Sequence, residues 1–337
     1  MARIGYHASH EQYAPGDLLR LVRLADRAGF RSGMCSDHFH PWGEKQGQSG
    51  FAWSWLGAAL QATSLSFGVV TVPGGWRYNP AIIAQAAATL AEMFPGRFWI
   101  APGSGELLNE GITGERWPPK AERNARLREA VDVIRALWTG ETVTHRGLVT
   151  VEEARIYSLP AEPAKIVAAA LSPETAEWVG EWADGMITVA GPRESMREMI
   201  DAFRRGGGEG KPIYLQAQLS YAKTEAEALH GAWEQWRTVR LPSPVLSDLR
   251  LPSQFDALGE GVSKEDVKEK MRVSADIERH IDWLAGDVEM GFEEINLHCV
   301  HREQQERFIE VFGEKVLPRL QALDPERLPR APRSSTR

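Results

Sequence analysis

Cysteine is scarce in this chain, which has only two among its 337 residues, Cys35 and Cys299. Both are flanked by apolar residues near the expected ends of strands. The simplest interpretation is two buried, reduced thiols in a cytosolic protein. The scarcity argues against a secreted protein held together by a disulfide framework.

Long hydrophobic runs and an excess of positive charge are also missing. No apolar run approaches the ~18 residues that a membrane span needs. The first expected strand begins near Arg3, which leaves no room for a signal peptide. With a formal net charge of −7 and a pI of about 5.8, the composition argues against a nucleic acid or an anionic membrane as partner. We therefore expect a cytoplasmic protein that acts on a small molecule, and any anionic ligand must be held by a local site.

The composition is otherwise that of a soluble globular protein, with 43% hydrophobic and 25% charged residues. A chain of this length can bury a large core. We expect one domain over residues 1–320. The remaining residues, 321–337, contain three prolines and two serines and are expected to form a disordered tail.

Strand-like and helix-like segments alternate along the chain. The expected strands are 4–6, 33–35, 66–71, 98–101, 165–170, 185–189, 212–220 and 293–298. The expected helices include one from Asp17 to about Gly29, one opened by Asn79-Pro80, one over 120–138 and one capped by Ser172-Pro173. An insertion over about 223–275 has helical and proline-rich pieces.

Eight strands, each followed by a helix, predict a (β/α)8 TIM barrel with insertions after several strands. The internal strands are short continuous apolar runs, as expected where both faces are buried. The competing fold is a doubly wound sheet. It would require Gly-x-Gly-x-x-Gly after the first strand, where this chain has His7-Ala8-Ser9-His10-Glu11. The barrel is favoured, and it places an active site at the C-terminal ends of its strands.

The segment Ser36-Asp37-His38-Phe39-His40-Pro41-Trp42 directly follows the second expected strand. An imidazole titrates near neutral pH, so His38 at such a position suits general acid–base chemistry. Trp42, Trp53 and Trp55 are expected on the same loop, where exposed aromatic side chains line a pocket for a planar ligand. The alternative is a structural histidine in a tight turn.

A second cluster, Gly103-Ser104-Gly105-Glu106-Leu107-Leu108-Asn109, follows the strand over 98–101. Its glycines allow the backbone to approach a ligand closely, and Glu106 can then act as an acid over the barrel mouth. An ordinary turn is the alternative. Because both clusters follow strands, we interpret them as one active site.

The sequence offers two further candidate ligand sites. The helix beginning at Ser172-Pro173 offers free amides for a phosphate, although an ordinary capped helix has the same sequence. Histidines could ligate zinc, but no aspartate or carboxylated-lysine signature accompanies them, and no metal is expected. The histidines considered were His7, His38, His40, His298 and His301.

Five segments form a combination that is specific, although no single segment is. They are Gly5-Tyr6-x-Ala8-Ser9-x-Glu11-Gln12, Ser36-Asp37-His38-Phe39-x-Pro41-Trp42, Arg77-Tyr78-Asn79-Pro80-Ala81, Gly103-Ser104-Gly105-Glu106-x-Leu108-Asn109-Glu110 and Ala125-Arg126-Leu127-Arg128-Glu129-Ala130. The combination resembles the luciferase-like hydride-transferase family, and within it the coenzyme F420-dependent glucose-6-phosphate dehydrogenase subfamily, over nearly the whole chain.

The resemblance implies a barrel with a deazaflavin ring across its mouth. The catalytic residues it implies are His38 as base, Trp42 as a substrate and charge-stabilising group, Glu106 as acid and Glu11 as a second carboxylate. The cofactor-binding residues it implies are Asp37 on the ring, Val70-Thr71 as a strained, often cis, peptide against the ring face, Gly103, Ser104, Gly105 and Asn109 of the glycine-rich segment, and the amides of Ala170, Leu171 and Ser172 on the phosphate.

The chain also departs from this subfamily. Ala257 stands where a phosphate-binding lysine is expected, and Lys270 replaces an arginine. The expected substrate contacts are then Trp42, Arg193 and Lys270, and a neutral alcohol or carbonyl compound is favoured over a sugar phosphate. Three functions remain open: an F420-dependent oxidoreductase on CH–OH groups, an FMN-dependent oxidoreductase or monooxygenase, and a cofactor-binding protein without turnover. A homodimer is expected.

Overall fold

The computed structural model describes residues 2–322, and the expected tail over 321–337 lies outside them except for its first two residues. Eight parallel strands form a closed barrel in this part of the chain. They are β1 (Arg3–Ala8), β2 (Ser32–Ser36), β3 (Ser66–Thr71), β4 (Phe98–Pro102), β7 (Lys165–Ala169), β8 (Gly185–Val189), β9 (Ile213–Ser220) and β11 (Glu294–Cys299). Strand β9 pairs with both β8 and β11, and this closes the ring. The predicted (β/α)8 barrel is confirmed.

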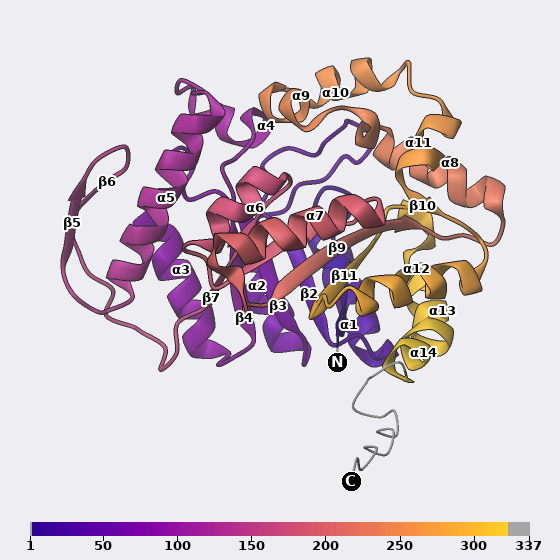
Figure 1. Cartoon of the computed structure of the whole chain (residues 1–337), viewed down its shortest axis with the longest axis horizontal. Helices are drawn as coiled ribbons and strands as arrows, with labels where there is room; N and C mark the ends of the chain where they lie inside the picture. The colour runs from indigo at the N-terminus through magenta and orange to yellow at the C-terminus, as the bar shows by residue number, and fades with distance from the viewer. Residues whose placement is uncertain (1, 323–337) are drawn as a thin grey trace, which may run out of the picture.

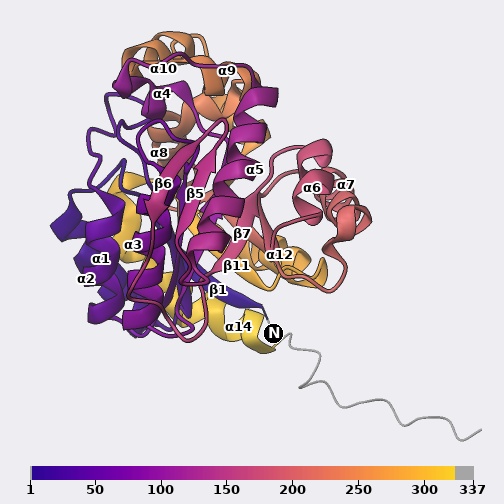
Figure 2. The ribbon, with the colours of Figure 1, turned by 90° about the vertical axis from the view of Figure 1, so that its left-hand side faces the viewer.

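Helices surround the barrel on its outside (Figures 1 and 2). They include α1 (Pro15–Ala28), α2 (Ala52–Ala62), α3 (Pro80–Met93), α5 (Lys120–Leu137), α6 (Pro173–Gly180), α7 (Arg193–Phe203), α12 (Ile277–Glu289), α13 (Gln305–Val311) and α14 (Leu317–Ala322). Local sequence explains two of their starts. The Asn79 side chain accepts from the amide of Ala81 before α3, and the Ser172 side chain accepts from the amide of Thr175 before α6. None of the described helices is both long and apolar enough to cross a membrane.

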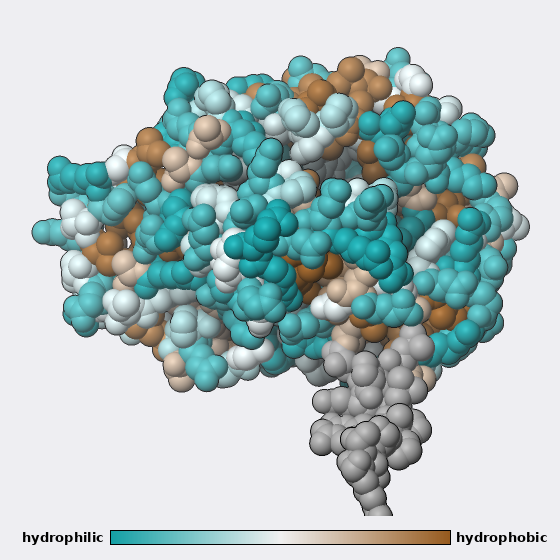
Figure 3. Space-filling view, viewed as in Figure 1, coloured by the Kyte–Doolittle hydropathy of each residue, from teal (hydrophilic) through white to brown (hydrophobic). Residues whose placement is uncertain are grey.

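The insertion between β9 and β11 lies over the C-terminal end of the barrel. It contains α8 (Glu225–Trp236), α9 (Ser243–Asp248), α10 (Pro252–Gly259), α11 (Lys264–Lys270) and the short strand β10 (Arg272–Val273). Helices α9 and α10 lie above the strands in both ribbon views (Figures 1 and 2). Apolar surface is visible over them (Figure 3), where Leu251 and Leu258 are about half exposed.

Two short antiparallel strands were not expected from the sequence. Strands β5 (Val143–Arg146) and β6 (Thr150–Ala154) form a hairpin outside α5 (Figure 2). Most of their side chains are polar and only one, Val151, is buried, so no apolar run or clear alternation marks them.

The lower part of the barrel interior is filled by side chains. Trp99 lies inside with Met34, Val167, Ile187 and Tyr214. Gly68 makes room for it, because a Cβ at Gly68 would lie 2.0 Å from the Trp99 ring. Open space is therefore left at the C-terminal ends of the strands, under the insertion.

Candidate active site

A cavity of about 900 Å³ lies at the C-terminal ends of the strands. Its walls come from the segments that follow most barrel strands and from the insertion. Residues that line it include His7, Glu11, His38, Trp42, Val70, Gly103, Ser104, Gly105, Glu106, Asn109, Lys120, Arg123, Leu171, Thr175, Trp236, Val239 and Leu246. The two clusters predicted from the sequence therefore meet in one cavity, as the barrel topology requires.

His38 lies between two carboxyl groups. Its Nδ1 atom is 3.2 Å from Oε1 of Glu11, and its Nε2 atom is 3.7 Å from Oε2 of Glu106. These contacts are close without being aligned hydrogen bonds. Glu11 is fully buried and accepts from the Ser9 hydroxyl, whereas about one third of the Glu106 side chain faces the cavity. The Trp42 ring meets the His38 ring edge to face at 5.1 Å.

Burial determines the protonation states of His38, Glu11 and Glu106. It lowers the pKa of His38 to about 3, with a further contribution from the positive charge of Arg77. It raises the pKa of Glu11 and the pKa of Glu106, each to about 7. Near neutral pH the imidazole is therefore uncharged and has a free lone pair. Two carboxyl groups that can each hold or release a proton lie on either side of it.

Glu11→Gln is expected to stabilise the protein at pH 8 but not at pH 5. The buried Glu11 binds a proton that the unfolded chain releases above its usual pKa of 4.5, so wild-type stability falls as pH rises from about 5 to about 7. Because glutamine does not titrate, the variant lacks this loss of unfolding free energy, which is on the order of 2–3 kcal/mol. Melting temperatures measured from pH 5 to 8 check it. A difference in melting temperature between Glu11→Gln and wild type that stays constant from pH 5 to 8 would contradict the account. The same pH profile for Glu162→Gln, which changes an exposed residue, would contradict it as well.

Asp37 is held in place by three protein donors. Its carboxylate accepts from Trp53 Nε1 at 3.1 Å, Thr71 Oγ1 at 3.1 Å and the Tyr78 hydroxyl at 3.2 Å, which connects the His38 loop to β3 and α2. Asp37 also lines the cavity, so its expected hydrogen bond to the cofactor ring stays a prediction.

Two tryptophans expected on the His38 loop are elsewhere. Trp53 and Trp55 belong to α2, and both are buried. Trp55 packs against Phe67 in the core. Their close sequence spacing to Trp42 suggested one loop, but a helix begins at Ala52 and turns both rings inward.

Arg77 and Glu110 fix the two motifs to each other. Arg77 Nε donates to Glu110 Oε1 at 2.9 Å, and Arg77 Nη2 donates to the Asp37 carbonyl at 2.6 Å. Both side chains are almost fully buried. Both residues lie in segments that carry the family resemblance, but no function was expected of them. Their opposite charges in two apolar strand-end segments were the available signal.

Asn109 connects the same motifs by hydrogen bonds. Its Oδ1 atom accepts from the amides of Phe39 and His40, and its Nδ2 atom donates to Oε2 of Glu106 at 3.3 Å. The buried side chain thus orients Glu106, and because Asn109 also lines the cavity, its expected contact with the cofactor stays a prediction.

The wall beside Glu106 suits a flat ligand. Gly105 has a φ of +85°, and a Cβ there would lie 2.9 Å from Val72. A Cβ at Gly103 would meet nothing within 4 Å, so the cavity is open above it. Val70 lines this wall, but Thr71 is buried and its hydroxyl donates a hydrogen bond to Asp37. All peptide bonds of the described residues are trans, so the cis bond suggested for Val70-Thr71 is wrong.

Of the three residues expected to bind the cofactor phosphate, Ala170, Leu171 and Ser172, the first has an amide that is already hydrogen-bonded. The Ala170 amide donates to the Ile187 carbonyl at 3.0 Å and cannot reach a ligand. Leu171 lines the cavity, and Ser172 caps α6. Lys120 and Arg123, at the start of α5, also line the cavity and were not predicted. No apolar strand directly precedes them, so the pattern of a strand followed by polar residues does not mark them.

The two cations predicted to hold substrate are outside the cavity. Arg193 begins α7, is half exposed and lies 3.5 Å from Glu289. Lys270 ends α11 and is exposed. Neither lines the cavity, and Ala257 is on the exposed side of α10. The positions were matched along the chain, but α7 carries Arg193 to the surface and the helices of the insertion turn Lys270 and Ala257 outward.

Comparison with known proteins identifies relatives over almost the whole chain. The family model described as luciferase-like monooxygenase matches residues 1–294. An F420-dependent glucose-6-phosphate dehydrogenase of Beutenbergia cavernae is 36% identical over 96% of this chain and 98% of its own, and one of Intrasporangium calvum is 34% identical over 96% and 100%. A solved F420-dependent secondary alcohol dehydrogenase, in complex with an F420-acetone adduct, is 30% identical with a TM-score of 0.85 and covers 95% of this chain and 99% of its own.

Proposed function

This chain belongs to the luciferase-like monooxygenase family, and we propose that within it the chain is a coenzyme F420-dependent oxidoreductase that oxidises a neutral secondary alcohol. F420-dependent dehydrogenases are similar to it over nearly its full length. The observation that carries the proposal is the uncharged His38, set between Glu11 and Glu106 at the edge of a cavity large enough for a planar cofactor.

The residues of the cavity fit a deazaflavin. Open space above Gly103 and the turn at Gly105 leave room for a ring against Val70. The start of α6 offers amides to a phosphate. A bound deazaflavin would supply the hydride chemistry, taking a hydride from the alcohol carbon or returning it to a carbonyl. The experiment below distinguishes F420 from FMN, the alternative cofactor.

The protein supplies the proton chemistry. His38 accepts the hydroxyl proton through Nε2, while Glu11 at Nδ1 orients the imidazole and stabilises its charged form. Glu106, with a pKa of about 7, holds or gives a proton at the ring side. Trp42 packs against the His38 ring and confines the substrate. A pure cofactor-binding protein would need neither the base nor the acid.

The substrate side of the cavity favours a neutral molecule. Trp42 and Val239 pack against an apolar cluster that contains Trp236, and all three line the cavity. Among the lysines and arginines of residues 2–322, the lining includes only Lys120 and Arg123, and their contacts are with α6, α9 and the loop before α5. A phosphate dianion beside His38 would be costly to desolvate without a cation.

We expect kcat/KM for simple secondary alcohols to exceed that for glucose 6-phosphate by at least about 100-fold, since the part of the cavity assigned to the substrate has no lining cation to pair with a phosphate. Loss of oxidised-cofactor absorbance, measured with F420 and separately with FMN, checks both points. Efficient use of glucose 6-phosphate would refute the substrate assignment. Turnover with FMN and none with F420 would refute the cofactor.

We also propose the extent of the domain, the cellular location and the oligomeric state. Residues 1–320 form one functional domain, the protein acts in the cytoplasm, and it forms a homodimer. The dimer proposal is supported by exposed apolar side chains on neighbouring segments, Phe51 before α2 and Ile82 on α3. A monomer mass by light scattering at micromolar concentration would contradict it.

A further inference from the structure

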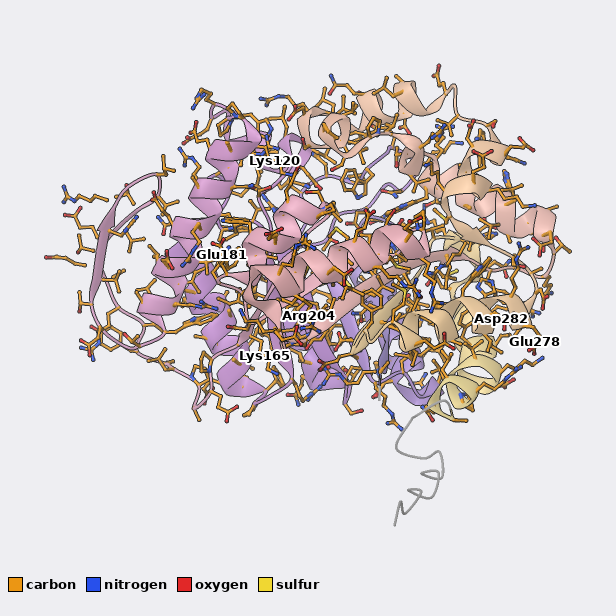
Figure 4. The ribbon with its side chains drawn as sticks, in the orientation of Figure 1. Lys120, Lys165, Glu181, Arg204, Glu278 and Asp282 are labelled. Atoms are coloured by element: carbon orange, nitrogen blue, oxygen red, sulfur yellow. The ribbon has the colours of Figure 1, made fainter. Side chains whose placement is uncertain are left out.

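One side of the barrel interior is polar, and the proton chemistry proposed above does not use it. All eight barrel strands run in the same direction, from the end of the barrel where Lys165 begins β7 toward the end where Lys120 lies (Figure 4). Lys120 lines the cavity, so the cavity opens at that second end. Inward side chains from the middle of the strands therefore form the cavity floor.

Strand β9 supplies two amide side chains to this floor. Because alternate side chains of a barrel strand point inward, Tyr214, Gln216 and Gln218 share the inner face of β9. Tyr214 packs against Trp99 in the filled lower part of the barrel. Gln216 and Gln218 follow it toward the mouth, are partly buried and line the cavity. Gln216 Nε2 lies 3.3 Å from Nδ1 of His298, an inward residue of the neighbouring strand β11.

His7, on β1, lies next to His298 and also lines the cavity. Only 3% of the residue is exposed, and its ring stacks on the His298 ring at 4.1 Å. The Nδ1 atom of His7 is buried and has no hydrogen-bond partner among the described residues. Burial lowers the pKa of His7 to about 3, with a smaller contribution from His10, so the ring is uncharged. It then has one donor and one acceptor nitrogen, and a buried polar atom without a partner indicates a missing ligand.

Four side chains form this polar arc: His7, Gln216, Gln218 and His298. The arc adjoins the substrate side of the cavity, because Trp236, which lines the cavity with Trp42, meets the His298 ring edge to face at 4.7 Å. In the ring of strands, β9 and β11 lie across the barrel from β3 and β4, which carry the wall assigned to the deazaflavin. The side chains that face the arc are apolar: Met34, Val70, Ala169 and Ile187.

We propose that the polar arc binds a second polar group of the substrate, an uncharged hydroxyl or carbonyl group several bonds away from the carbinol carbon. The proposal rests on the proposed function, since the alcohol at His38 is taken from there. It narrows the substrate class to neutral alcohols that carry two oxygen functions. None of the four side chains is charged near neutral pH, so the arc favours a neutral group over a carboxylate or a phosphate.

The depth of His7 in the barrel sets the spacing of the two groups. His7 pairs in register with Met34, two residues before β2 ends at Ser36, whereas His38 lies beyond that end. Two strand residues span about 7 Å. A substrate that places its carbinol at His38 therefore reaches His7 only through a chain of several carbon atoms. Hexane-1,5-diol is an alcohol of this kind.

The test compares hexane-1,5-diol with hexan-2-ol, the same secondary alcohol without the terminal hydroxyl. Values of kcat and KM with F420, and Kd for F420 from tryptophan fluorescence, are measured in wild type, His7→Phe, His7→Gln and His10→Phe. His10 provides the matched control. It is also a fully buried histidine whose ring nitrogens have no partner among the described residues, but it does not line the cavity.

Wild type is expected to have a kcat/KM for the diol about tenfold above that for hexan-2-ol, mainly through KM, because the terminal hydroxyl satisfies a buried polar group. His7→Phe should bring this ratio to about 1 by weakening the diol alone. His7→Gln keeps a donor and an acceptor and should retain a ratio above that of His7→Phe. His10→Phe should have the wild-type ratio, and Kd for F420 should stay close to wild type in all variants.

A wild-type ratio near 1, with turnover of hexan-2-ol, would overturn the role of the polar arc without any variant. A wild-type ratio that persists in folded His7→Phe would overturn it too. Equal loss of both alcohols in His7→Phe would also do so, and weaker F420 binding in that variant would show that His7 contacts the cofactor instead. If wild type oxidises neither alcohol with F420, the proposed function fails, and the role of the arc fails with it.

Discussion

His38→Ala is expected to lower kcat by about 10²–10⁴-fold while leaving Kd for F420 close to the wild-type value. The imidazole lies at the cavity edge with Nε2 turned toward Glu106 and the open space, and no other histidine of the described residues lies within 4.0 Å of both the Glu11 and the Glu106 carboxylates. Its loss removes the acceptor for the hydroxyl proton but no contact that a cofactor ring requires. Steady-state rates with an alcohol substrate and a fluorescence titration with F420 measure the two effects separately.

A matched control is His230→Ala. His230 is an exposed histidine on α8 and does not line the cavity, so its removal should change neither quantity. If His38→Ala retains turnover within a few-fold of wild type, the general-base assignment is wrong. If it loses F420 binding to the same extent as turnover, His38 is a binding residue.

Arg77→Leu is expected to destabilise the protein by about 3–5 kcal/mol, because it leaves two carboxylates buried without their cation. Arg77 is 6% exposed and pairs with Glu110 at 2.9 Å and with Asp37 at 3.7 Å. Chemical denaturation monitored by tryptophan fluorescence gives the change in unfolding free energy.

The control for this effect is Arg116→Leu. Arg116 forms an even shorter ion pair with Glu122, at 2.6 Å, but its side chain is 71% exposed, so its loss should cost less than about 1 kcal/mol. The double variant Arg77→Leu with Glu110→Leu should recover part of the loss. Similar costs at Arg77 and Arg116 would mean that the buried pair does not hold the two motifs together.

The barrel was predictable because each internal strand is buried on both faces and is therefore a short apolar run. The run Gly185–Val189 was expected with the same bounds that the structure has. Helix starts were predictable where a cap and an N1 proline coincide, as at Asn79-Pro80. The closeness of His38 and Glu106 followed from topology, since both come after parallel strands whose C-terminal ends share one face.

What the sequence could not predict depends on where side chains point within loops and insertions. Trp53 and Trp55 were placed on a loop, but α2 begins there and buries them. Arg193 and Lys270 were nominated by chain position, although the helices that carry them present them to solvent. Lys120 and Arg123 reach the cavity only because the loop after β4 returns α5 to the barrel mouth. No local pattern encodes such long-range placement.

The central claim is that hydride passes between the carbon of a neutral alcohol and the deazaflavin while His38 accepts the hydroxyl proton. The most direct measurement follows an isotope. The purified protein is incubated with F420 and propan-2-ol deuterated at C2, and the reduced cofactor is analysed by mass spectrometry. The account predicts one carbon-bound deuterium in the reduced cofactor, none when only the hydroxyl is deuterated in D2O, and a rate reduced about 10²–10⁴-fold in His38→Ala. Reduced cofactor without substrate deuterium, or reduction by glucose 6-phosphate alone, would contradict it.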